Sequence, residues 1–159
     1  MGYDFNMDEI FEMAEQIEKN GAKFYREAAD RIAEPPNKNL LIKLAEMEDQ
    51  HQKTFAFLRT QLSEGEKAPA VFDPDGEAAL YLRALADIRI FFEKEIDVTS
   101  METILKEALV AEKDSIVFYL GMKDLVPDDL GKEKIDQIIK EEMAHIKLLS
   151  NQLLALKQQ

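Results

Sequence analysis

The chain has 159 residues, of which 46% are hydrophobic and 33% charged, and its formal net charge at pH 7 is −12. This length suits one domain with its own core, so we predict a single domain over residues 1–159. The acidic balance, with no dense Lys/Arg cluster, argues against a nucleic-acid partner. Because the chain contains no Cys, disulfides, zinc ribbons, thiolate iron sites and cysteine catalysis are excluded.

The start of the chain, MGYDFNMDEI, carries acidic residues where a secretory signal needs a basic start and an apolar run. No later stretch reaches the uninterrupted apolar length that crosses a bilayer. We therefore expect a cytoplasmic protein with no membrane partner.

Apolar residues recur at helical spacing in four segments of the chain. These segments are 7–33, 38–63, 100–125 and 130–157. The short links at 34–37 and 126–129 predict that each adjacent pair is antiparallel, which gives helical hairpins over 7–63 and 99–157. The expected fold is an all-α, antiparallel four-helix bundle.

Turn-forming and capping residues fit these limits. Pro35-Pro36 is expected to stop the first helix and Asn37 to cap the second. The third is expected to begin with a capping box of Thr99 and Glu102. The sequence Pro127-Asp128-Asp129 separates the third and fourth helices.

The segment 64–98 connects the two hairpins. It opens with turn-formers and continues as an apolar, predicted helical stretch from Glu77 to Glu95, long enough to cross the bundle. The apolar run Ile88–Phe92 within it is expected to cover the core or to form a dimer surface.

The two hairpins repeat each other at a spacing of 94 residues. The matching pairs are Glu18-Lys19 with Glu112-Lys113, Phe24-Tyr25 with Phe118-Tyr119, Glu48 with Glu142, and His51 with His145. The polar positions among these lie on otherwise apolar stripes, so we interpret the pattern as a duplicated hairpin.

Each apolar stripe is interrupted by one Glu, and in the second and fourth helices a His follows three residues later on the same face. Burying such groups without partners costs several kcal/mol apiece. Two divalent cations would balance four carboxylates. The predicted metal ligands are Glu18, Glu48, His51, Glu112, Glu142 and His145. The alternative is that both histidines are ordinary half-buried residues that hydrogen-bond to glutamates.

Tyr25 and Tyr119 follow the single glutamates by two turns and are predicted either to hydrogen-bond the ligands or simply to pack in the core. Gly21 and Ser115 occupy equivalent positions and either leave room at the site or allow close helix packing. Other acids fall off the stripes and are expected on solvated faces. They are Glu12, Glu15, Glu46, Asp49, Glu107 and Glu141.

Oxygen ligands with one imidazole per ion suit iron or manganese. We therefore expect two redox-active ions, two iron ions with manganese possible, that carry out two-electron chemistry on hydrogen peroxide or O2.

The ordered motifs resemble the rubrerythrin-like branch of the ferritin-like di-iron superfamily over nearly the whole chain. They are Glu18-x-x-Gly21-x-x-x-Tyr25, Glu48-x-x-His51, Glu112-x-x-Ser115 and Glu142-x-x-His145. The resemblance implies a ferritin-like bundle of two duplicated hairpins joined by a long, partly helical crossover, and peroxide reduction. Two features depart from rubrerythrins. The chain has no rubredoxin module, so an external donor such as rubredoxin is expected, and Ser115 stands where rubrerythrins carry a further glutamate.

Two other functions remain open. One is ferritin-type Fe(II) oxidation for iron handling, which is less favoured because no fifth C-terminal helix follows 130–157. The other is a non-enzymatic helical interaction module with a structural metal site. We expect a homo-oligomer, a dimer rather than a cage.

Overall fold

The structure is a computed structural model and describes residues 7–62, 77, 80–82, 84, 100–126 and 128–158. Its long helices are α1 (Met7–Arg31), α2 (Pro35–Thr60), α4 (Met101–Leu125) and α5 (Lys132–Lys157). Each of the four predicted long helices is present, with its ends within three residues of the expected positions, and the described part contains no strand. None of the described helices is apolar enough over a sufficient length to cross a membrane.

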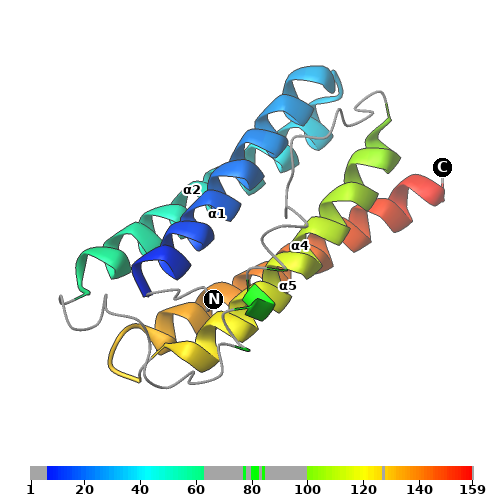
Figure 1. Cartoon of the computed structure of the whole chain (residues 1–159). Coiled ribbons are helices and arrows are strands. Elements are labelled where there is room, and N and C mark those ends of the chain that lie inside the picture. Colours follow the sequence, from blue (N-terminus) through cyan, green and yellow to red (C-terminus); the bar gives the residue numbers. More distant parts are fainter. Residues whose placement is uncertain are drawn as a thin grey trace.

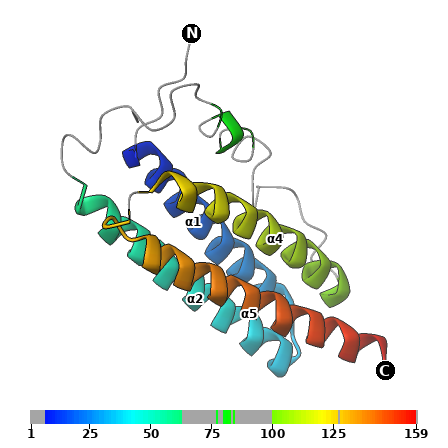
Figure 2. The same ribbon diagram turned by 90° about the horizontal axis from the view of Figure 1, so that it is seen from below.

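The four helices form two antiparallel hairpins that pack lengthwise against each other (Figure 1). α1 lies beside α4, and α2 lies beside α5, as Figure 2 shows from a second direction. The end of α2 and the start of α4 lie at opposite ends of the bundle. This arrangement confirms the predicted all-α, antiparallel four-helix bundle with a long crossover.

Most of the predicted crossover, including the Ile88–Phe92 run, lies outside the described residues. Five of its positions are described, and all five are helical: Glu77, Leu80, Tyr81, Leu82 and Ala84. Leu82 is fully buried, and its side chain and that of Tyr81 lie close to Gly121 of α4.

The duplication seen in the sequence is also present in the helices. α4 has the same length as α1, and both of its ends lie 94 residues further along the chain. Both helices bury the equivalent Phe-Tyr pair, Phe24-Tyr25 in α1 and Phe118-Tyr119 in α4. The aromatic rings pack close together in the core, with 5.1 Å between the ring centres of Phe55 and Tyr119.

The starts of α2 and α4 differ from the prediction. Pro35 and Pro36 occupy the first turn of α2 rather than separating two helices, because a proline there loses no helical hydrogen bond. Asn37 is therefore not a cap. It is buried, donates to Glu34 Oε2 at 2.5 Å and accepts from Gln152 Nε2 at 2.7 Å, which ties α2 to α5.

The cap of α4 is one residue later than expected. The Ser100 side chain accepts a hydrogen bond from the backbone nitrogen of Thr103 at 3.4 Å, so Ser100 holds the capping position assigned to Thr99. Thr99 itself lies outside the described residues.

The turn between α4 and α5 depends on Gly131, whose φ of 98° favours glycine. A Cβ added there would lie 2.5 Å from Leu58 Cδ2 in the other hairpin. We expect Gly131→Ala to lower the free energy of unfolding by about 1–2 kcal/mol, through backbone strain and the contact with Leu58. Urea unfolding measures this change. Asp129→Ala, at an exposed position of the same turn, is the control, and equal stability of the two variants would contradict the prediction.

Candidate metal centre

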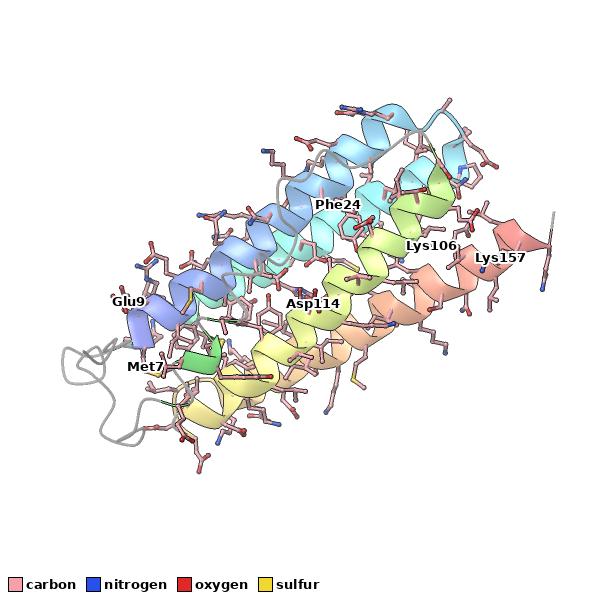
Figure 3. All side chains as sticks on the ribbon, turned by 45° about the vertical axis from the view of Figure 1, so that its right-hand side comes forward. Met7, Glu9, Phe24, Lys106, Asp114 and Lys157 are labelled. Carbon is pink, nitrogen blue, oxygen red and sulfur yellow. The ribbon has the colours of Figure 1, made fainter. Side chains whose placement is uncertain are left out.

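The six predicted ligands come from all four helices and meet in the middle of the bundle. Asp114, labelled in Figure 3, lies about halfway along α4. Glu112 precedes it by two residues in the same helix. All six side chains are buried, and the most exposed of them, His51, keeps only 3% of its surface. The sequence prediction that these residues converge is confirmed, and their role as metal ligands stays a prediction.

The six residues form two groups that are each capable of holding one cation. The groups are Glu18, Glu48, His51 and Glu142, and Glu48, Glu112, Glu142 and His145. Within each group, one candidate ligand atom per residue lies within 4.8 Å of all the others. Glu48 and Glu142 belong to both groups, so these two carboxylates are the ones that two bound ions would share.

Both imidazoles direct Nδ1 toward the carboxylates. Nδ1 of His51 lies 3.2 Å from Glu142 Oε1, and Nδ1 of His145 lies 2.9 Å from Glu142 Oε2. The two rings stack with their centres 5.7 Å apart. A single glutamate thus reaches both histidines, one with each oxygen, as a bridging ligand would.

Without a cation, burial of the six side chains disfavours the ionised form of the carboxylates. Burial, together with Glu142, raises the pKa of Glu112 to about 7, and burial, together with Glu48, raises the pKa of Glu18 well above its usual value. Burial opposes a charge on His145, but the surrounding carboxylates outweigh it and raise its pKa to about 12. Without a cation, the cluster therefore holds protons in place of metal.

Buried polar atoms without hydrogen-bond partners show whether a metal fits. In the described part of the chain these atoms are Glu48 Oε1 and Oε2, Glu112 Oε2, Glu142 Oε2, and both ring nitrogens of His145. The 2.9 Å between His145 Nδ1 and Glu142 Oε2 is a close contact that does not meet hydrogen-bond geometry. Such atoms are rare in folded proteins because each costs free energy. All of them belong to the cluster, and oxygen and imidazole nitrogen are the donors that iron and manganese accept. The residues present therefore fit a pair of such ions.

Two tyrosines support the carboxylates from the opposite hairpin. The Tyr25 hydroxyl of α1 donates to Glu112 Oε1 of α4 at 2.5 Å, and the Tyr119 hydroxyl of α4 donates to Glu18 Oε1 of α1. Burial and the nearby carboxylates raise the pKa of both tyrosines, so both keep their protons for these bonds. Of the two sequence interpretations, the hydrogen bond to a predicted ligand is the one that the structure shows.

Two acids expected on solvated faces are placed differently. Glu15 is 8% exposed, and it accepts hydrogen bonds from Gln52 and Arg59 of α2. Glu141 accepts a hydrogen bond from Nε2 of His51, with 2.7 Å between the atoms. Sequence reasoning missed this contact because Glu141 belongs to the row next to the apolar stripe.

The small residues beside the cluster also have defined surroundings. Gly21 is buried in α1, and Ser115 is buried in α4 with its hydroxyl donating to the backbone oxygen of Ala111 at 2.9 Å. The Ser115 hydroxyl is therefore hydrogen-bonded within its own helix, and its side chain provides no carboxylate to the centre.

Comparison with known proteins identifies the fold. The chain resembles the crystal structure of a Thermotoga maritima protein described as ferritin-like and diiron-carboxylate, with a TM-score of 0.70 and 22% sequence identity. The match covers 96% of this chain and 97% of the other. No protein-family model matches the sequence, and no curated protein does either. The fold is ferritin-like. The buried Glu/His cluster in such a fold fits a di-iron protein.

Proposed function

We propose that the chain binds two iron ions in this centre and reduces hydrogen peroxide or O2 with electrons from an external donor. The proposed ligands are Glu18, Glu48, His51, Glu112, Glu142 and His145. One observation carries the proposal: two buried ligand groups share Glu48 and Glu142, so two cations held by these groups would lie side by side. Two adjacent redox-active ions suit a two-electron reaction, whereas a structural site needs only one ion without redox chemistry.

When bound, a pair of ferrous ions supplies two electrons, which with two protons convert one hydrogen peroxide into two waters. The residues of the chain prepare the site for this chemistry. Four carboxylates balance the charge of two divalent ions, and the surrounding aromatic core excludes bulk water. Tyr25 and Tyr119 hold protons at their hydroxyls next to Glu112 and Glu18, which keeps those carboxylates in fixed orientations.

The proposal places the electron donor outside this chain. With no Cys, the chain cannot carry the thiolate iron site of a rubredoxin. A separate donor such as rubredoxin, and a homodimer rather than a cage, complete the proposal. The rubrerythrin-like motifs around Glu18, Glu48, Glu112 and Glu142 support it, while Ser115 in place of a further glutamate favours slower peroxide turnover than in rubrerythrins.

The deciding experiment loads the protein anaerobically with Fe(II), removes unbound metal and measures iron per chain. The loaded protein is then mixed with equal concentrations of peroxide or O2, and the absorbance change is followed. We expect two irons per chain and a faster reaction with peroxide.

Each alternative has its own result in the same experiment. Iron handling would be favoured instead if the protein reacted faster with O2, turned over excess Fe(II) and had the mass of a cage. Stoichiometric metal that reacts with neither oxidant would favour a structural site. A chain that retains no iron, and no manganese when it is loaded with Mn(II) in the same way, would refute the centre itself.

A further inference from the structure

The two halves of the centre differ in how their histidines are supported. Nε2 of His51 is 2.7 Å from Glu141 Oε2, and Gln137, one turn earlier on α5, donates to the other oxygen of Glu141 at 3.5 Å. Nε2 of His145 is buried and has no hydrogen-bond partner among the described residues. The outer nitrogen of the His51 imidazole is therefore anchored, and that of His145 has no such anchor in the part of the chain that the structure describes.

The duplication identifies the residue responsible for this difference. Glu141 lies in α5 directly before Glu142, and the position 94 residues earlier, directly before Glu48 in α2, is Met47. Met47 is half-buried and has no carboxylate to offer. The repeat is thus broken at the one position that would give His145 the partner that His51 has.

An outer partner affects metal binding through the tautomer of the ring. An imidazole binds a metal through Nδ1 only when its remaining proton is on Nε2. A carboxylate that accepts from Nε2 holds the proton there, fixes the ring orientation and makes Nδ1 a stronger donor. Loss of such a partner typically costs about 10–100-fold in metal affinity.

We propose that Glu141 is a positioning residue that makes the two metal positions unequal, so that the ion beside His51 binds first and more tightly. This inference rests on the proposed metal centre. Glu141 contacts the ring of His51, and His51 belongs to only one of the two ligand groups, so its effect should be confined to one ion. The chain would then fill in a fixed order, His51 side before His145 side.

The test exchanges the two equivalent residues. Stepwise affinities of the full chain for Co(II) are measured by calorimetry and visible spectra in four proteins: wild type, Glu141→Met, Met47→Glu and the double variant. We expect Glu141→Met to weaken the first ion about 10–100-fold and leave the second unchanged. Met47→Glu should strengthen the second ion. Glu107→Gln, at an exposed position of α4, controls for the loss of one negative charge.

A spectroscopic readout identifies which position fills first. The chain has only two histidines, so 15N-histidine labelling gives a simple spectrum. When Zn(II) is added stepwise, the first equivalent should shift the His51 signals and the second those of His145. In the double variant the order should reverse. The inference is overturned if the double variant keeps the wild-type order, or if Glu141→Met weakens both ions equally, as general destabilisation would. A wild-type chain that binds neither Co(II) nor Zn(II) overturns the metal centre itself, before any variant is compared.

Discussion

Glu142→Ala is expected to abolish stable binding of both metal ions. Glu142 belongs to both ligand groups, and its two oxygens lie 3.2 Å from His51 Nδ1 and 2.9 Å from His145 Nδ1. Loss of an outer partner alone costs about 10–100-fold in affinity, so loss of a ligand shared by two ions should cost more than about 100-fold for each. Iron per chain after anaerobic loading and gel filtration measures the effect.

A variant of a terminal ligand provides the comparison. His145 belongs to only one group, so His145→Ala should leave the other ion in place and give an intermediate iron content. Glu133→Ala removes an exposed carboxylate from the same helix and should keep full occupancy. Circular dichroism should show α-helix in all three variants, because the packed core is intact. Full iron content in Glu142→Ala would contradict the shared-ligand assignment.

The fold and the six converging residues could be predicted because each feature left a periodic mark in the sequence. Long amphipathic helices produce apolar stripes, and a polar residue on such a stripe must lie in the core once the stripe is buried. The sequence alone therefore predicts that four glutamates lie in the core: Glu18, Glu48, Glu112 and Glu142. The repeat also fixed which helices pair, since each half had to form a similar hairpin.

The features that were missed depend on contacts between helices, which periodicity does not encode. Glu141 is next to the stripe, and its carboxylate reaches His51 only because α5 packs against α2. Glu15 is likewise buried only because Arg59 and Gln52 approach from the neighbouring helix. The mismatch between Met47 and Glu141 in the repeat was the one feature of the sequence that pointed to the contact between Glu141 and His51. Without the contact to His51, nothing distinguished that mismatch from ordinary divergence between two surfaces.

The metal-free protein is expected to lose stability as the pH rises from about 4.5 to above 7. The metal-loaded protein is expected to gain stability over the same range. The pKa of Glu112 is raised from 4.5 to about 7, so between these values the folded chain holds a proton that the unfolded chain releases. The free energy of unfolding then falls as the pH rises through this window. The shift of Glu112 alone corresponds to about 3 kcal/mol.

The histidines act in the same direction at higher pH. Burial opposes their charge, but the carboxylates outweigh it and raise the pKa of His145 from 6.5 to about 12. The unfolded chain loses this proton above pH 6.5 while the folded chain keeps it, so stability continues to fall. Metal binding requires ionised carboxylates and neutral imidazoles, so it releases these protons and becomes tighter as the pH rises. The melting temperatures of loaded and metal-free protein should therefore separate with increasing pH.

Thermal unfolding followed by circular dichroism between pH 5 and 8, with chelator or with anaerobic Fe(II), measures both trends. Repulsion within a chain of net charge −12 also grows with pH, so the contribution of the cluster must be isolated. Glu112→Gln keeps the shape of the side chain but cannot ionise, and it should flatten the decline of the metal-free protein. The exposed Glu107→Gln should leave it unchanged. If both variants had the wild-type slope, surface repulsion would account for the decline, and the buried carboxylates would be satisfied without a cation.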